Sequence, residues 1–133
     1  MARDILLIDD DDFMVELVSS LLLARGYAVR SARDGESGLA EALCQPPGLV
    51  ILDVNMPGMD GYTVTRRLAE AESTRRVPIV AATASFRDNG AEEARAAGCN
   101  GYLPKPINAE DLYRTVATLL GESAPPDRQG AAE

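Results

Sequence analysis

Short apolar runs alternate with longer amphipathic segments along this chain. The apolar runs predict five strands, at residues 4–9, 27–32, 49–53, 77–83 and 101–103. The segments between and after them have helical periodicity and predict five helices, at residues 11–25, 35–44, 60–72, 87–97 and 108–120. This alternation favours an α/β fold, with a parallel sheet built from right-handed βαβ units.

Capping residues support these limits. Asp11 and Asp12 can both cap the first helix and interact favourably with its positive end, and Gly26 can close it. Asp60 is a plausible N-cap for the third helix, and Gly98 is a stop signal after the fourth.

Five βα units in 133 residues favour a doubly wound, five-stranded parallel sheet of flavodoxin type, with strand order 2-1-3-4-5. The length is that of one domain with a single core, and the sequence has no internal repeat. We expect the folded domain to span residues 1–120. Residues 121–133 are rich in Pro, Gly and Ala without apolar periodicity, which predicts a flexible tail or a linker remnant.

Composition excludes several classes of function. The formal net charge is −8 and the pI is near 4.5, so nucleic-acid binding is not expected. The absence of His excludes His-based catalysis and His-ligated zinc. No apolar run reaches the length of a membrane span and no signal peptide is evident, so we expect a soluble, cytoplasmic protein. We interpret Cys44 and Cys99 as reduced, small core residues.

Acidic residues follow two of the predicted strands. Asp9 and Asp10 come directly after the first strand, and Asp53 ends the third. Ligands of doubly wound sheets bind beyond the carboxyl ends of the strands where the strand order reverses, here between strands 1 and 3. Repulsion among three carboxylates there favours protonation unless a cation joins them. The sequence therefore predicts a site for a hard divalent cation, most plausibly Mg²⁺.

Two further residues complete a chemical set at the same edge. Thr83 ends the fourth predicted strand and supplies a hydroxyl, and Lys105 follows the fifth, where prolines on both sides restrict its backbone. Carboxylates for a cation, a nucleophilic carboxylate, a hydroxyl donor and an ammonium suit phosphoryl transfer to Asp53. Mg²⁺ and Lys105 would offset the charge of the phosphoryl oxygens, and Thr83 would donate to one of them.

These residues match a known family. The chain resembles the receiver domains of two-component response regulators over about its first 120 residues. The resemblance is carried by Asp9-Asp10, the run from Asp53 to Gly61, Thr83-Ala84 and Lys105-Pro106, in family order and spacing. As a set these motifs are highly specific.

The resemblance implies a role for each site residue. Asp53 would be the phosphoacceptor. Asp10, Asp53 and the backbone carbonyl of Asn55 would ligate Mg²⁺, and Asp9 would act through a bound water. The position of Tyr102 matches the switch aromatic of the family, although its residue type alone indicates ordinary strand packing.

The resemblance also implies a function and partners. The protein would be a phosphorylation-activated signalling switch rather than a classical enzyme, and it would promote its own phosphorylation and dephosphorylation. A histidine kinase or phosphotransfer protein would supply the phosphoryl group, and a downstream target protein would read the change. By the same resemblance, the Lys105–Pro106 bond is expected to be cis.

Other functions are compatible with parts of this pattern. The domain could be a phosphorelay carrier, or a receiver module of a larger regulator or hybrid kinase. From a different class, the carboxylates could serve a Mg²⁺-dependent phosphatase with an aspartyl-phosphate intermediate. Such enzymes of haloacid-dehalogenase type usually have an Asp-x-Asp motif and a cap domain, whereas Asn55 follows Asp53 here and no segment is long enough for a cap. A flavin carrier is a weaker alternative, because the acidic loop after the first strand would repel a phosphate.

The first predicted helix contains more apolar residues than one buried stripe requires. Two interpretations stay open: a wide core face with a few exposed residues, or an apolar edge beside the acids where a phosphodonor protein docks. The residues concerned are Phe13, Met14, Val15, Leu17, Val18, Leu21, Leu22 and Leu23.

Overall fold

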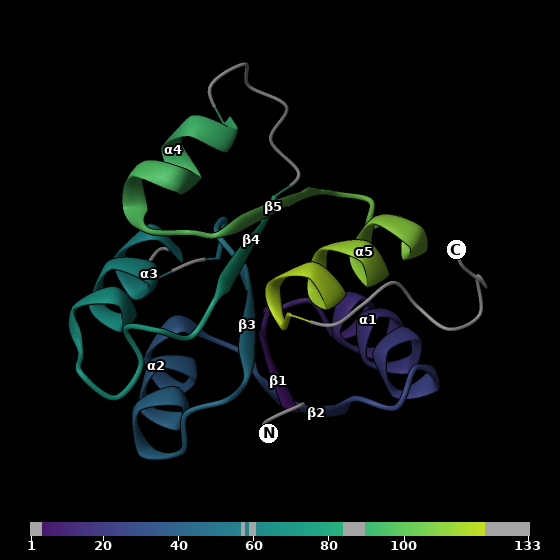
Figure 1. The fold of residues 1–133 in the computed structure, drawn as a ribbon, viewed down its shortest axis with the longest axis horizontal. Coiled ribbons are helices and arrows are strands. Elements are labelled where there is room, and N and C mark those ends of the chain that lie inside the picture. Colours follow the sequence, from purple (N-terminus) through teal and green to yellow (C-terminus); the bar gives the residue numbers. More distant parts are fainter. Residues whose placement is uncertain (1–3, 57, 59–60, 84–89, 122–133) are drawn as a thin grey trace.

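A parallel sheet with the strand order β2-β1-β3-β4-β5 forms the centre of the protein (Figure 1). The computed structural model describes residues 4–56, 58, 61–83 and 90–121. The strands are β1 (Asp4–Ile8), β2 (Ala28–Ala32), β3 (Leu49–Asp53), β4 (Ile79–Thr83) and β5 (Gly101–Pro104). The helices in the described ranges are α1 (Asp12–Ala24), α2 (Gly35–Cys44), α3 (Gly61–Glu70), α4 (Gly90–Ala97) and α5 (Ala109–Leu119). The predicted fold class, strand order and element sequence are confirmed.

Helices cover both faces of the sheet, α1 and α5 on one and α2, α3 and α4 on the other (Figure 1). Alternate residues of each central strand therefore enter two different cores. In β1, Ile5 and Leu7 pack with α1 and α5, whereas Leu6 and Ile8 pack toward α2 and α3. Burial on both faces explains why β1, β3 and β4 read as continuous apolar runs in the sequence.

The register of the strands aligns the residues that end them. Ile8 lies opposite Leu52 in the β1–β3 pair, so Asp9 follows level with Asp53. Backbone hydrogen bonds continue the pairing beyond the strands: Asp9 N–H donates to Ala32 O (3.0 Å), and Lys105 N–H donates to Thr83 O (2.8 Å). The residues after β1 and β5 are thus held in place by main-chain contacts.

The predicted cap and stop signals of α1 and the predicted stop after α4 are confirmed. The Asp11 side chain caps α1 by accepting from Phe13 N (3.0 Å), whereas Asp12 lies inside the first turn. Gly26 and Gly98 have positive φ angles of 89° and 112° in the turns after α1 and α4. The expected cap at Asp60 lies outside the described residues, as do residues 87–89 at the start of the predicted fourth helix.

The core assignment of Cys44 is wrong. Cys44 is exposed, because α2 turns Leu39 and Ala42 toward the sheet, and the next two residues face away from it. Cys99 is buried as expected, with its Sγ atom 3.6 Å from the Thr65 hydroxyl. Neither cysteine forms a disulfide.

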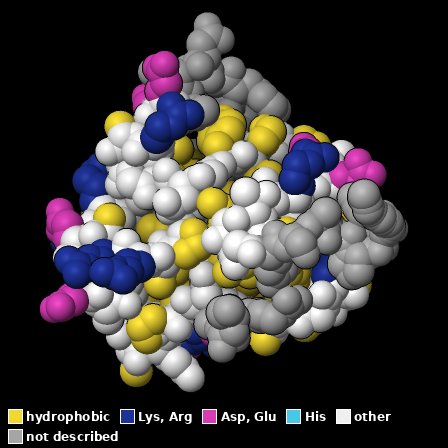
Figure 2. Space-filling model, viewed as in Figure 1, with side chains coloured by type: hydrophobic (Ala, Val, Ile, Leu, Met, Phe, Trp, Pro, Cys, Tyr) yellow, Lys and Arg dark blue, Asp and Glu magenta, His cyan; other side chains and the backbone are white. Residues whose placement is uncertain are grey.

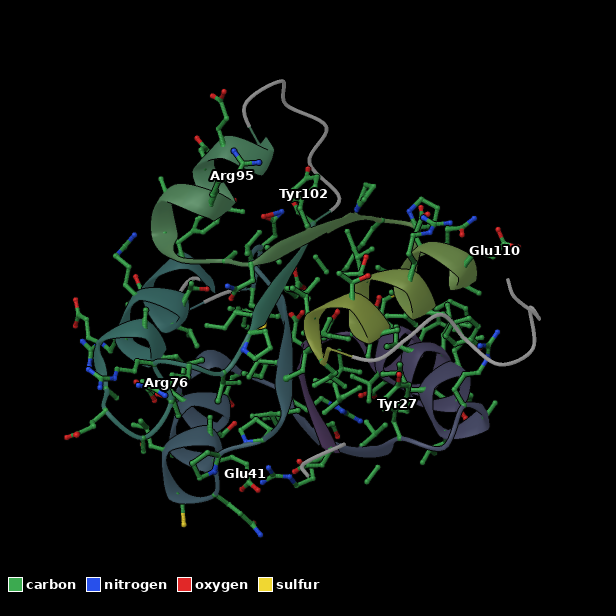
Figure 3. All side chains as sticks on the ribbon, viewed as in Figure 1. Tyr27, Glu41, Arg76, Arg95, Tyr102 and Glu110 are labelled. Atoms are coloured by element: carbon green, nitrogen blue, oxygen red, sulfur yellow. The ribbon has the colours of Figure 1, made fainter. Side chains whose placement is uncertain are left out.

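An ion-pair network ties the chain together at the opposite end of the sheet from the Asp53 carboxylate. The Arg30 guanidinium on β2 pairs with Asp4 (2.9 Å) and with Glu41 of α2, which is labelled in Figure 3. It also donates to the Gln45 carbonyl (2.8 Å), and Asp4 accepts from Gly48 N (3.1 Å). These contacts join β1 and β2 to the connection between α2 and β3.

On the face in Figure 2, the basic side chains of the described residues lie around the edge, with acidic side chains next to them. The prediction against nucleic-acid binding rests on the net charge of −8. Within the described ranges, none of the helices has the length and apolar character needed to cross a membrane.

Gly61 lets α3 approach β3 closely. A Cβ atom at residue 61 would lie 2.4 Å from Val54 Cα and 3.0 Å from the Asp53 carbonyl oxygen. Both neighbours are backbone atoms, of Asp53 and of the residue after it, so a change of side-chain rotamer cannot move them aside. Glycine at this position therefore lets α3 pack against the strand that carries Asp53.

We expect Gly61→Ala to destabilise the protein by about 1–3 kcal/mol or more, because the added methyl group overpacks this contact. Arg67→Ala on the exposed side of the same helix is the control and should change stability by less than about 0.5 kcal/mol. Urea unfolding followed by circular dichroism measures both. Equal stability of the two variants would contradict the tight contact.

We expect Asp34→Ala to lower the urea midpoint at neutral pH and to lose this effect in acid. The Asp34 carboxylate caps α2 by accepting from Ser37 N (2.7 Å), and this hydrogen bond holds the pKa of Asp34 below its usual value. Since the folded-state pKa is depressed, the stabilisation is present above the unfolded pKa of about 3.9 and is lost as the pH falls through the folded value. Urea midpoints of the two proteins should converge over that range, and a constant difference would argue against the charged cap.

Candidate functional site

Three carboxylates meet at the carboxyl edge of the sheet. One oxygen each from Asp9, Asp10 and Asp53 lies within 4.8 Å of the others. Asp9 and Asp53 are buried, with 2% and 6% of their surface exposed, whereas Asp10 is exposed. The structure thus brings together the acids that the sequence places at the ends of strands 1 and 3.

Lys105 lies against the two buried acids. Its Nζ atom donates to Asp9 Oδ2 at 3.1 Å and lies 3.4 Å from Asp53 Oδ2. The side chain is only 16% exposed, and the Lys105–Pro106 bond is cis, as predicted. The ammonium group therefore bridges the ends of β1 and β3 from the β5 side.

Backbone N–H groups hold the other oxygen of each buried acid. Asp9 Oδ1 accepts from Asp11 N, and Asp53 Oδ1 accepts from Asn55 N, both at 2.9 Å. Each carboxylate thus has one oxygen toward Lys105 and one on the loop that follows its own strand. These contacts fix the orientation of both carboxylates.

The titration of Asp9 reflects a balance of burial and charge. Burial raises the pKa of Asp9 and outweighs the Asp11 N–H and the Lys105 ammonium, which both lower it, while the charge of Asp53 raises it further. Burial alone would lower the pKa of Lys105, but Asp53 and Asp9 together overcome it and raise that pKa. The raised pKa favours the protonated form of Lys105, but one ammonium does not balance the charge of three ionised carboxylates.

The donor set fits a hard divalent cation. With all three carboxylates ionised, one ammonium would leave two negative charges in excess. Their oxygens are the ligand type that Mg²⁺ prefers, and the described cluster contains no thiolate or imidazole that would favour a softer metal. The exposure of Asp10 gives an ion access from solvent.

Thr83 and Asn55 lie together beside these acids. Thr83 is the last residue of β4 and is 2% exposed, and its hydroxyl oxygen accepts from Asn55 Nδ2 at 3.1 Å. The expected metal contact of Asn55 involves its backbone, so the sequence did not indicate this side-chain contact. Asn55 lies two positions beyond the end of β3, next to β4 in the sheet. This position in the sequence could have indicated a contact with the end of β4.

Tyr102 lies on β5 opposite Ala81 and is half-buried on the side of the sheet that α4 covers. It lines a surface pocket with Arg95 of α4, and both are labelled in Figure 3. Ala81 and Thr83 are two residues apart in β4, so their side chains point to the same face of the sheet. Tyr102 is paired with Ala81 and lies on that face too.

Arg33 is a charged residue near this edge that the sequence interpretation missed. Its Nε atom lies 2.8 Å from Asp12 Oδ1, and both side chains are largely exposed. Arg33 directly follows β2, so the rule that found Asp9 and Asp53 could also have found it. An exposed pair of this kind contributes little to stability.

Helix α1 buries one side and exposes the other. Met14, Val15, Val18 and Leu22 are buried, and Leu17 and Leu21 pack partly against the same core. Phe13 and Leu23 are 68% and 57% exposed. The wide core face is therefore present, and two large apolar side chains remain on the surface.

Comparison with known proteins identifies close relatives of this arrangement. The family model described as the response regulator receiver domain matches residues 5–117. The response regulator PleD of Caulobacter vibrioides is 38% identical over 119 residues, which cover 90% of this chain but only 26% of PleD. The polar-differentiation response regulator DivK of Brucella ovis is 29% identical over 123 residues, covering 92% of this chain and 100% of DivK.

Solved structures agree. The chemotaxis response regulator CheY4 of Vibrio cholerae has a TM-score of 0.83 at 31% identity, covering 90% of this chain and 99% of CheY4. The receiver domain of the sensor histidine kinase PA1611 of Pseudomonas aeruginosa, solved with magnesium coordinated in its active-site cleft, has a TM-score of 0.83 at 32% identity. That match covers 92% of this chain and 100% of the PA1611 domain. The chain belongs to the response regulator receiver domain family, whose members are phosphorylation-activated signalling switches.

Proposed function

We propose that Asp53 accepts a phosphoryl group from a phosphohistidine on a histidine kinase or phosphotransfer protein. The observation that carries this proposal is the position of the Asp53 carboxylate, which lies 3.4 Å from the Lys105 ammonium and has an oxygen within 4.8 Å of Asp9 and Asp10 oxygens. A carboxylate in contact with a fixed cation can approach an anionic phosphoryl group with its charge partly offset.

The chemistry is a transfer between two nucleophiles. A carboxylate oxygen of Asp53 attacks phosphorus, a P–O bond forms, the P–N bond to the donor histidine breaks, and the electron pair returns to the imidazole. Such transfers depend mainly on positioning and charge stabilisation. The hydrogen bond from Asn55 N to Asp53 Oδ1 supplies positioning by fixing the plane of the carboxylate.

Asp9, Asp10, Asp53 and the backbone carbonyl of Asn55 would hold Mg²⁺ in this proposal. Receiver domains bind Mg²⁺ at their acidic site, and the excess of negative charge in the cluster supports the same role here. When bound, Mg²⁺ supplies positive charge to the phosphoryl oxygens. Since Asp9 Oδ2 and Asp53 Oδ2 face Lys105, the exposed Asp10 is the carboxylate best placed to take an ion from solvent.

Lys105 and Thr83 would stabilise the product. The Lys105 ammonium would pair with one phosphoryl oxygen, and the Thr83 hydroxyl would donate to another. A shift of Thr83 would then change the packing of Tyr102 on the same face of the sheet, and a downstream target protein would read the surface of α4, β5 and α5. Energetically, phosphorylation would shift an existing equilibrium between two states. The same groups would let the domain promote its own phosphorylation and dephosphorylation.

The α1 surface would receive the phosphodonor. Phe13 follows the acidic loop directly and is largely exposed, which supports an apolar contact beside Asp53. In this proposal the domain spans residues 1–120, and residues 121–133 form a tail or linker. The relation to PleD, in which the matching segment is 26% of the length, and to the receiver domain of PA1611 keeps two other settings open: a module of a larger regulator or hybrid kinase, and a phosphorelay carrier.

We expect Asp53→Asn to abolish phosphorylation. Incubation of the wild type with acetyl phosphate and Mg²⁺ should add one phosphoryl group, which intact-mass spectrometry detects. Asp12→Asn removes an exposed acid in the first turn of α1 and should still be labelled. Full labelling of Asp53→Asn would refute the assignment of the acceptor, and rapid turnover of small phosphate esters by the wild type would favour a phosphatase.

We expect Asp10→Ala to weaken Mg²⁺ binding by about tenfold or more, since even outer-sphere partners of a metal typically contribute 10- to 100-fold. Asp12→Ala removes the same charge nearby and controls for the general electrostatic effect. Calorimetric titration with MgCl₂ compares the two variants. Similar affinities for both would show that Asp10 is not a ligand.

A further inference from the structure

Four arginines lie close together in the sequence, in the second half of α3 and in the connection from α3 to β4. They are Arg66, Arg67, Arg75 and Arg76, and we call them the arginine patch. With two glutamates between them, Glu70 and Glu72, the segment 66–76 has a formal charge of +2, whereas the whole chain has −8. Positive charge is thus concentrated in one short segment of an acidic protein.

Hydrogen bonds fold the connection after α3 back onto the helix. The Thr74 hydroxyl donates to the Leu68 carbonyl at 2.7 Å, and the Thr74 side chain is buried. Val77 N–H closes the turn by donating to the Thr74 carbonyl at 3.0 Å. Arg75 and Arg76 therefore follow a buried anchor that holds them beside the last turns of α3.

The side chains of the arginine patch are exposed and almost without partners. Among the described residues, the side chains of Arg67, Arg75 and Arg76 have no hydrogen bond or ion pair, and Arg66 has only a 3.5 Å contact with the Thr63 hydroxyl. Other described arginines mostly have a partner: Arg30 and Arg33 pair with acids, Arg114 pairs with Asp111, and Arg25 lies over the Tyr113 ring. The fold thus leaves the charge of the arginine patch available to another molecule.

The arginine patch lies away from the acidic site. In Figure 2, dark blue side chains gather at the left edge, over α3 and its connection to β4, and Arg76 is labelled there in Figure 3. The connection enters β4 at its amino end, where Val50 N–H donates to the Pro78 carbonyl at 2.9 Å. Asp53 ends β3 at the opposite edge of the sheet. A molecule bound at residues 75–76 would therefore leave the acidic site accessible.

The chemistry of the arginine patch favours carboxylates presented on a short chain. A guanidinium matches a carboxylate with two parallel hydrogen bonds. A long uniform polyanion, such as a nucleic acid or an anionic membrane, would be repelled by the net charge of −8 and by Glu70 and Glu72 within the same segment. A short acidic segment can place its charges against the arginines and avoid the rest of the surface.

We infer that the arginine patch is a docking surface for an acidic segment, rich in Asp and Glu, of a partner protein. This role goes beyond the proposed phosphoryl transfer and does not depend on Asp53. Because the two surfaces lie at opposite ends of the sheet, docking is independent of phosphorylation. The partner would hold the receiver nearby in both of its states.

An NMR titration with a deca-glutamate peptide at low salt tests the inference. In the wild type, the backbone signals of residues 66–76 should shift most. The double variant Arg75→Gln, Arg76→Gln should bind the peptide roughly two- to thirtyfold more weakly, the range for two exposed ion pairs. No shift in residues 66–76, or wild-type affinity in this variant, would overturn the inference.

The matched control removes the same charge elsewhere on the surface. Arg95→Gln with Arg114→Gln replaces two exposed arginines of α4 and α5, and it should change the affinity by less than about twofold. Circular dichroism checks that both double variants are folded. Equal losses in the two double variants would show a general effect of net charge and would overturn the inference.

Other ligands test the class of partner. Deca-glutamine should not bind, and about 1 M NaCl should release deca-glutamate, because the screening length is then only about 3 Å. A ten-nucleotide oligothymidylate and phosphatidylserine vesicles should bind more weakly than deca-glutamate. Equal or tighter binding of either one would overturn the assignment to an acidic protein segment.

The Asp53→Asn variant separates this inference from the proposed function. It should bind deca-glutamate with the affinity of the wild type, and a loss of affinity would contradict docking that is independent of phosphorylation. If the wild type is not phosphorylated at Asp53, the proposed function fails, while the deca-glutamate titration still decides whether the arginine patch binds an acidic segment.

Discussion

The contact of Lys105 with Asp9 and Asp53 is the interaction on which the acidic site depends. Two buried carboxylates this close would otherwise favour protonation of one of them, and a protonated acid is a poor ligand and a poor nucleophile. Lys105 stabilises the charged forms but leaves the cluster short of positive charge. The negative charge that remains makes the cluster suited to a divalent cation.

Sheet geometry brings these charges together with little help from side-chain flexibility. Parallel strands end at a common edge, and the register places Asp9 level with Asp53. Backbone hydrogen bonds then hold the residues just beyond the strands, from Asp9 to Ala32 and from Lys105 to Thr83. Because Gly61 lets α3 pack close to Val54, the segment after Asp53 is confined from the helix side as well.

The sequence was sufficient for the architecture and for the acidic residues, because both depend on regular periodicity. Continuous apolar runs that end in Asp specify a buried strand and its functional end at the same time. The sequence did not predict features that depend on the direction in which a side chain points from a helix or a loop. Cys44 follows the buried Ala42 by two positions on α2 and faces away from the sheet. The positions of Asn55 and Arg33 just beyond strands place both residues near this edge, but the sequence does not specify that the Asn55 side chain contacts Thr83 or that Arg33 pairs with Asp12.

The ion-pair network of Arg30 lies at the other end of the sheet, and its described contacts include none of Asp9, Asp53 and Lys105. The stabilising ion pairs thus lie toward the amino ends of the strands, and the acidic cluster lies at their carboxyl ends. Residues around the acidic site could therefore change during evolution while the ion-pair network of Arg30 continues to stabilise the fold. Conversely, loss of Arg30 would lower the stability of the fold and so the amount of folded protein in a cell, while the acidic site of each folded molecule would stay unchanged.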